Sequence, residues 1–197
     1  MLRRSGVNVL MCTRYYSSIQ DFKTLEQMKK LLLIIFTLTT MEALAQKTYQ
    51  ETVEANGTKI LKGVISKEVL LYEPSFTWYA EKEKNYTPPQ AAVDALKAKG
   101  EKIQIICFGG TWCEDTQNIL PKFFVLSTTA GFMQNRLTLI GVDRSKKTYG
   151  ALAEALGITN VPTFIVMNNG KEIGRVVEYG KTGQWDKELG EIIAGVQ

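Results

Sequence analysis

The sequence predicts an α/β domain in which a central mixed β-sheet is flanked by helices on both faces. Short apolar runs of strand length alternate with segments of helical spacing, and glycine and proline separate them. Strands that alternate with helices need crossover connections, which lay the strands side by side and cover the sheet with helices. The 197 residues, of which 45% are hydrophobic, suit one such domain preceded by a leader.

The leader is predicted at residues 1–45 and the folded domain at residues 46–197. Residues 28–45 combine a basic start, the apolar run Leu31–Leu38 and small residues just before Gln46. This order is typical of a bacterial-type secretory signal peptide. We therefore expect an exported protein that is periplasmic or secreted.

The residues before Met28 allow a second interpretation. A secretory signal lies at the extreme N-terminus, so residues 1–27 are expected to be upstream of the true start. Alternatively, Met1–Gln20 is basic without an acidic residue, which is typical of an organellar transit peptide. The stretch from Leu31 to Ala45 contains Glu42 and falls short of the roughly 20 apolar residues that span a bilayer, so no stable membrane anchor is expected.

The composition of the domain excludes several function classes. The leader holds six of the 24 basic residues and three of the 20 acidic ones, which leaves 18 against 17 in the domain. Such a balance gives no argument for nucleic acid or an anionic membrane as a partner. The chain has no histidine, and two cysteines follow the leader. A Cys-His protease, a Ser-His-Asp hydrolase and a structural zinc site are therefore excluded, and we expect no metal and no cofactor.

The first part of the domain begins with a predicted strand over Ile60–Ile65. The pattern of Ser66–Glu83 is ambiguous, and Pro74 interrupts it. A helix is predicted from Pro88-Pro89 to Gly100, because proline favours a helix start and glycine a helix end. Aromatic side chains that could either floor a peptide groove or, as we favour, cover the core gather in this part: Phe76, Trp78, Tyr79 and Tyr86.

The middle of the domain contains a buried strand, a helix and a second strand. Ile103–Phe108 is an apolar run that Gly109-Gly110 ends, so a helix is expected to start near Cys113. Pro121 lies deep enough in that helix to remove an internal hydrogen bond and bend its axis. Arg136–Asp143 is the next predicted strand.

The last part of the domain is predicted to hold a short helix, a hairpin and a final helix. The short helix ends before Gly157. Thr163–Met167 and Ile173–Val177 flank a tight turn at Asn168-Asn169-Gly170 and should pair antiparallel. Thr182 can cap the final helix, whose inward stripe is formed by Trp185, Leu189 and Ile192.

The segment Trp112-Cys113-Glu114-Asp115-Thr116 places one thiol where a strand gives way to a helix. Unpaired N–H groups and the helix dipole stabilise a thiolate there, so Cys113 is a candidate nucleophile. Thr116 occupies the position from which a second sulfur would attack a mixed disulfide. The carboxylates of Glu114 and Asp115 oppose ionisation of the thiol, although acids also suit the first turn of any helix, and both interpretations stay open.

From about residue 59 to residue 194 the chain resembles the thioredoxin family. The features that carry the resemblance, in order, are Trp112-Cys113, the helix proline Pro121, Val161-Pro162-Thr163 and Asn169-Gly170. The resemblance implies a thioredoxin-like fold.

The resemblance also implies roles for individual residues. Cys113 would be the nucleophile, and the peptide bond between Val161 and Pro162 would be cis, presenting backbone to an extended substrate. Trp112 would shield the thiol and shape the docking surface. Thr116 departs from the family, because its hydroxyl could hydrogen-bond the thiolate but cannot release a trapped substrate.

Cys107 aligns with a strand position where the family often carries a buried acid. It could resolve the mixed disulfide of Cys113 from below, or it could be a small buried hydrophobe, which is the interpretation we favour.

Two functions follow as hypotheses. The first is thiol-disulfide exchange by a single cysteine, of the monothiol reductase or isomerase type, which would contribute to cell redox homeostasis. Its partners would be a protein or small-molecule disulfide as substrate and an external thiol or redox partner protein that completes the cycle. The second is a redox-inactive module that uses the thioredoxin fold to bind a peptide or protein.

Overall fold

The computed structural model describes residues 26–33 and 47–197, which belong to two separate units divided between Lys47 and Thr48. Residues 26–33 are helical and exposed. The remainder of the predicted signal peptide, including its cleavage site, and the alternative transit peptide at Met1–Gln20 lie outside the described residues. Within the described parts of the chain, no helix combines the length and apolar character that a membrane span requires.

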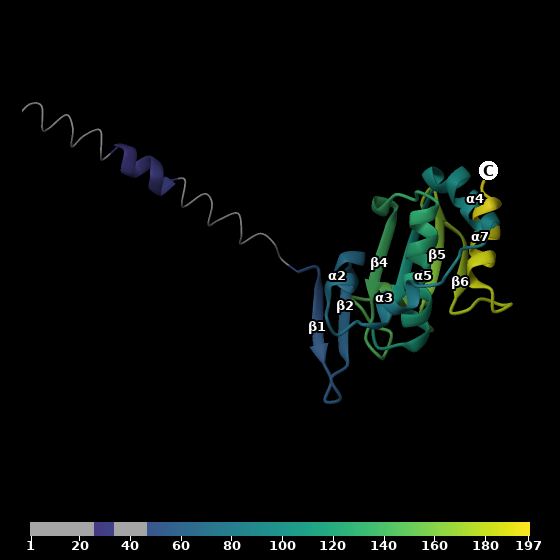
Figure 1. Cartoon of the computed structure of the whole chain (residues 1–197), viewed down its shortest axis with the longest axis horizontal. Coiled ribbons are helices and arrows are strands. Elements are labelled where there is room, and N and C mark those ends of the chain that lie inside the picture. The colour runs from purple at the N-terminus through teal and green to yellow at the C-terminus, as the bar shows by residue number, and fades with distance from the viewer. Residues whose placement is uncertain (1–25, 34–46) are drawn as a thin grey trace, which may run out of the picture. The chain divides into compact units, whose positions relative to one another are not determined.

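The second unit is built on one six-stranded sheet with the order β1-β2-β4-β3-β5-β6 (Figure 1). β3 and β4 run parallel, and the other neighbouring pairs are antiparallel, which confirms the predicted mixed sheet. The strands are β1 (Tyr49–Val53), β2 (Lys59–Ile65), β3 (Ile103–Gly109), β4 (Leu137–Gly141), β5 (Thr163–Asn168) and β6 (Lys171–Val177).

The helices connect these strands, and all of the predicted ones are present. In α5 the proline at position 121 lies inside the helix, as predicted. The helices are α2 (Lys67–Tyr72), α3 (Trp78–Glu83), α4 (Gln90–Lys99), α5 (Glu114–Thr129), α6 (Leu152–Ala155) and α7 (Trp185–Ala194), and two 3₁₀ turns lie at Gly100–Lys102 and Gln134–Arg136.

The two faces of the sheet are covered unequally. One face packs with side chains from α2, α3, α4, α5 and α7 into a large core that includes Leu70, Phe123 and Leu189. The other face carries a smaller cluster, in which α6 contributes Ala153 and the following loops contribute Ile158. Successive residues of a strand point to opposite faces, so each central strand contributes to both cores.

β1 is a strand that the sequence pattern did not reveal. Its residues Tyr49–Val53 are mostly exposed, so they carry no alternation of apolar and polar side chains. The strand exists because it pairs antiparallel with β2, from Tyr49 opposite Gly63 to Val53 opposite Lys59. Pairing with a neighbour is a tertiary property, which a local pattern does not report.

The ambiguous segment Ser66–Glu83 forms α2 and α3, with Pro74 in the connection. Ser66 caps α2 by accepting a hydrogen bond from the N–H of Val69. The aromatic side chains of this part form core rather than a groove: Phe76 and Tyr79 are buried in the large core, and Trp78 and Tyr86 pack against it.

The predicted cap of the final helix was wrong. Gln184, not Thr182, is the N-cap of α7. The backbone N–H groups of Lys181 and Thr182 donate to the Glu188 carboxylate, as does the Thr182 hydroxyl. Gly183 has a positive φ of 78°, so the chain turns between Thr182 and the helix, which removes the threonine from the capping position.

Candidate functional site

The thiol of Cys113 lies at the junction that the sequence predicts. Cys113 is the N-cap of α5, directly after the loop that leaves β3. Its N–H donates to the carbonyl of Gly110 at 2.9 Å. The side chain is partly exposed and packs against the smaller core.

The predicted cis peptide bond between Val161 and Pro162 is confirmed. It lies beside the thiol, because Cys113 Sγ donates to the Val161 carbonyl at 3.2 Å. The Pro162 carbonyl accepts from the N–H of Glu178 at 2.7 Å, which ties this loop to the chain after β6. The structure therefore brings together residues that are 48 positions apart in the sequence.

Trp112 directly precedes Cys113 in the sequence. Its indole Nε1 donates to the carbonyl of Val142 at 3.0 Å. The ring packs closely on Gly110, where an added Cβ would lie 2.7 Å from a ring carbon. Two cations lie over the ring, with the Arg144 guanidinium carbon 5.1 Å and the Lys146 Nζ 5.8 Å from its centroid.

Thr116 is buried, with 1% of its surface exposed. Its hydroxyl accepts from the N–H of Gly110 at 3.2 Å, and no hydrogen bond joins it to Cys113. The hydrogen bond that this hydroxyl could make to the sulfur is therefore not formed in this structure. What the side chain does is hold the loop between β3 and α5, since its methyl also packs against Gly109.

The two acids of the motif differ in their surroundings. Glu114 is exposed, while Asp115 is half-buried and interacts with the hydroxyl of Tyr179. That hydroxyl also accepts from Asn118 Nδ2 at 3.0 Å. Partial burial raises the pKa of Tyr179, and the negative charges of Asp115 and Cys113 add to the shift. Tyr179 thus lines the thiol site.

Sequence reasoning missed four residues of this site: Val142, Arg144, Lys146 and Tyr179. Val142 acts through its backbone carbonyl, which carries no signal in the sequence. The others lie on loops after β4 and β6, and only the parallel pairing of β3 with β4 and the hairpin of β5 with β6 place those loops beside α5.

Cys107 and Cys113 lie on opposite faces of the sheet. Cys107 belongs to the large core with Ile105, whereas the next residue, Phe108, belongs to the smaller core against which Cys113 packs. Both cysteines are free thiols. Burial raises the pKa of Cys107 well above its ordinary value, because an apolar core penalises the thiolate. These observations favour the interpretation of Cys107 as a buried hydrophobe over that of a resolving thiol.

We expect iodoacetamide to modify Cys113 and spare Cys107 in the folded protein. Cys113 is partly exposed at a helix start, while Cys107 is fully buried and its pKa is raised. The measurement is mass spectrometry of the modified peptides, with and without denaturant. In denaturant both thiols should react at similar rates, and rapid modification of Cys107 in native buffer would contradict the assignment.

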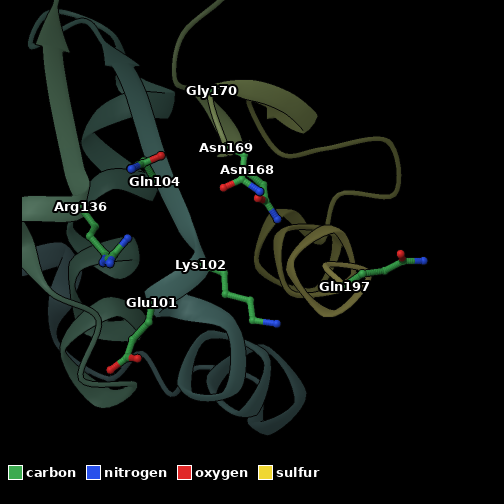
Figure 2. A pocket seen from close by; sticks show the side chains of 8 residues that line it. All are labelled: Glu101, Lys102, Gln104, Arg136, Asn168, Asn169, Gly170 and Gln197. Atoms are coloured by element: carbon green, nitrogen blue, oxygen red, sulfur yellow. The ribbon is translucent and has the colours of Figure 1, made fainter.

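A polar cavity of about 410 Å³ lies near the start of β3, and Figure 2 shows the side chains that line it. The residues that line it are Glu101, Lys102, Gln104, Arg136, Asn168, Asn169, Gly170 and Gln197. None of the predicted site residues belongs to it, since Gln104 is near the start of β3 and Cys113 follows its end. Among the residues that the structure describes, no three Cys, Asp or Glu side chains gather as a candidate metal site.

Comparison with known proteins finds a matching family model and several relatives. The sequence model of the thioredoxin family matches residues 89–190, which include the thiol motif and the Val161-Pro162 loop. The chain is 33% identical over 92 residues to a thioredoxin of Echinococcus granulosus, an alignment that covers 46% of this chain and 80% of the relative. It is 37% identical over 84 residues to an H-type thioredoxin of Chlamydomonas reinhardtii, covering 41% of this chain and 70% of the relative.

Solved structures give a weaker likeness. Thioredoxin f from spinach chloroplast shares 23% identity with the chain at a TM-score of 0.35, over 59% of this chain and 90% of that protein.

Proposed function

This chain belongs to the thioredoxin family, and from that premise we propose that it performs thiol-disulfide exchange with one nucleophilic cysteine, Cys113. Its relatives are thioredoxins, which support thiol-disulfide redox chemistry on protein substrates in general. The observation that carries the proposal is the position of the Cys113 sulfur, partly exposed at the start of α5 and 3.2 Å from the Val161 carbonyl.

The reaction starts when Cys113 loses its proton to solvent, which also ends the hydrogen bond to Val161. The thiolate attacks one sulfur of a substrate disulfide, so a Cys113–substrate disulfide forms and the old disulfide breaks. The second substrate sulfur leaves as a thiolate and takes a proton from water. The Val161 carbonyl, released by the cysteine, can then accept a hydrogen bond from the backbone of an extended substrate.

A second thiol must finish the cycle, because position 116 holds threonine. A thiolate from the substrate itself or from an external thiol attacks the mixed disulfide, and Cys113 returns to the thiolate form. Attack by another substrate cysteine gives isomerisation. Attack by an external thiol leaves the substrate joined to that thiol, and a second external thiol completes its reduction.

We expect the wild-type protein to accumulate as a mixed disulfide with a peptide substrate when no other thiol is present. Thr116→Cys should release the peptide and leave an internal disulfide, because the new sulfur lies one helical turn from Cys113. The measurement is mass spectrometry after acid quenching. Thr116→Val is the matched control, since it has no thiol and should accumulate the same adduct. Equal release by wild type and Thr116→Cys would contradict a one-thiol mechanism.

A redox-inactive binding module is the second candidate function. The observations that favour it are the threonine at position 116 and, among the residues that the structure describes, the burial of the other free thiol, Cys107, in the opposite core. In that function the Val161-Pro162 loop would hold an extended peptide without chemistry. A peptide that binds equally well before and after alkylation of Cys113, in a protein without exchange activity, would support this candidate.

We further propose that the protein is exported, to the periplasm or as a secreted protein, and that residues 46–197 act as the functional domain after removal of residues 1–45. The support is the basic, apolar and small-residue order of residues 28–45. N-terminal sequencing of the protein from its native source tests this, because processing before Gln46 is expected and an N-terminus upstream of Met28 would contradict it.

A further inference from the structure

The hairpin of β1 and β2 lies at the edge of the sheet, before the segment that the family model matches (Figure 1). Its turn is ordered by its own hydrogen bonds. The N–H of Glu54 donates to the Thr58 carbonyl, and the N–H of Gly57 donates to the Glu54 carbonyl, each at 2.9 Å. Asn56 Oδ1 accepts from the N–H of Thr58 at 3.0 Å. The side chain of Glu54 therefore starts from a defined backbone position.

The hairpin contacts the loop that carries the reactive cysteine. The hydroxyl of Thr111 donates to the Lys59 carbonyl at 2.8 Å and accepts from the N–H of Leu61 at 3.2 Å. Thr111 directly precedes Trp112, so β2 holds the loop one residue from the indole and two from the thiol. Lys59 and Leu61 make these contacts through backbone groups, which leaves their side chains for packing and ion pairs.

The hairpin also contacts the loop after β4. Glu54 binds Arg144 through two hydrogen bonds, from Nε to Oε1 at 2.6 Å and from Nη2 to Oε2 at 2.7 Å. The hydrogen bond from Arg144 is the main cause that lowers the pKa of Glu54, so the carboxylate is ionised at neutral pH. A second ion pair joins Lys62 to Asp143 at 3.2 Å. Both pairs end on neighbouring residues of the same loop.

Arg144 connects this ion pair to the indole. Its guanidinium carbon lies 5.1 Å from the centroid of Trp112, within the range of a cation–π contact. Half of the Arg144 side chain is exposed, so a guanidinium without a partner would occupy many rotamers. The bidentate contact with Glu54 selects the rotamer that covers the ring, because the planar fork fits a carboxylate in one geometry.

We propose that Glu54 and Arg144 are positioning residues that hold the indole of Trp112 beside the Cys113 thiol. The proposal rests on the function proposed above. The indole is restrained by the hydrogen bond from Nε1 to the Val142 carbonyl, by its packing on Gly110 and by two cations on its face. Of these two cations, the hairpin holds Arg144 through Glu54. The hairpin is thus part of the thiol site, and its effect is on substrate docking rather than on the sulfur itself.

The experiment compares wild type with Glu54→Gln, Arg144→Gln and the double variant. One readout is the hydrogen-exchange rate of the Trp112 indole N–H, assigned by NMR with Trp112→Phe. The other is single-turnover exchange with a mixed disulfide between a cysteine peptide and glutathione. It gives the peptide concentration at half-saturation and the limiting rate of exchange. Each single variant should exchange its indole proton about threefold faster and need about threefold more peptide, with an unchanged limiting rate.

The double variant should match the single ones, because the two residues act as a unit. Glu172→Gln is the matched control, since Glu172 makes an equivalent bidentate pair with Arg175 on β6, away from Trp112. Unchanged indole exchange and half-saturation in both single variants, or equal changes in Glu172→Gln, would overturn the proposal. Failure of the proposed function is distinguishable, because wild type would then show no turnover while the indole exchange still reports on Glu54 and Arg144.

Discussion

Cys113→Ser is expected to abolish disulfide exchange, with a loss on the order of a thousandfold or more in the rate of mixed-disulfide formation. The reason is chemical: a serine hydroxyl at this position does not ionise near neutral pH and does not form a stable bond with sulfur. Because Cys113 is only partly buried and is the N-cap of α5, and serine is a favourable N-cap, the variant should keep its fold. The measurement is the rate at which thiol is released from a mixed disulfide between a cysteine peptide and glutathione. Circular dichroism checks that the variant is folded.

The matched control for this variant is Cys107→Ala, which removes the other thiol of the folded domain. Cys107 is fully buried in the large core on the opposite face of the sheet. Its replacement should lower the stability and leave the exchange rate within about twofold of wild type. Retained exchange in Cys113→Ser together with loss in Cys107→Ala would show that the nucleophile had been assigned to the wrong cysteine.

Phe164→Ala is expected to lower the free energy of unfolding by about 3–5 kcal/mol, the largest effect on stability predicted for this chain. Phe164 is fully buried on β5. Its ring centroid lies 4.8 Å from that of Phe123 on α5 and 5.7 Å from that of Trp185 on α7, so the ring joins the sheet to both helices. Truncation leaves a cavity that these two rings cannot fill without rotating. Urea denaturation of the domain measures the change.

Tyr72→Ala serves as the control for this prediction. Tyr72 is the last residue of α2 and is 77% exposed, so its loss removes little packing and should change the stability by no more than about 0.5 kcal/mol. Similar midpoints for the two variants would contradict the assignment of Phe164 to the core. Phe164→Ala should also affect disulfide exchange, because Phe164 packs on α5 and the start of α5 carries Cys113. Near the unfolding midpoint of the variant, exchange should be slower because part of the protein has lost the folded α5.

Much of the fold follows from patterns within a few residues. The apolar run of β3, the glycines at its end and the helical segment after Cys113 were predicted because strands and helices impose periods of 2 and 3.6 residues on their buried faces. The turn at Asn169-Gly170 was predicted because it needs positive φ, and the two residues have φ of 49° and 76°. β1 was not predicted, because an exposed edge strand has no such pattern.

The local sequence was sufficient to place a thiol at a helix start, and the resemblance to the thioredoxin family implied that the Val161-Pro162 loop lies beside it. Contacts over long separations decided the rest. Cys107 and Cys113 are six positions apart in the chain, yet strand alternation and the loop after β3 send them to opposite faces of the sheet. The bond between Arg144 and Glu54 spans 90 positions, and it forms because β2 pairs with β4. Such contacts depend on strand order and register, which the packing of the whole domain determines and which no local pattern encodes.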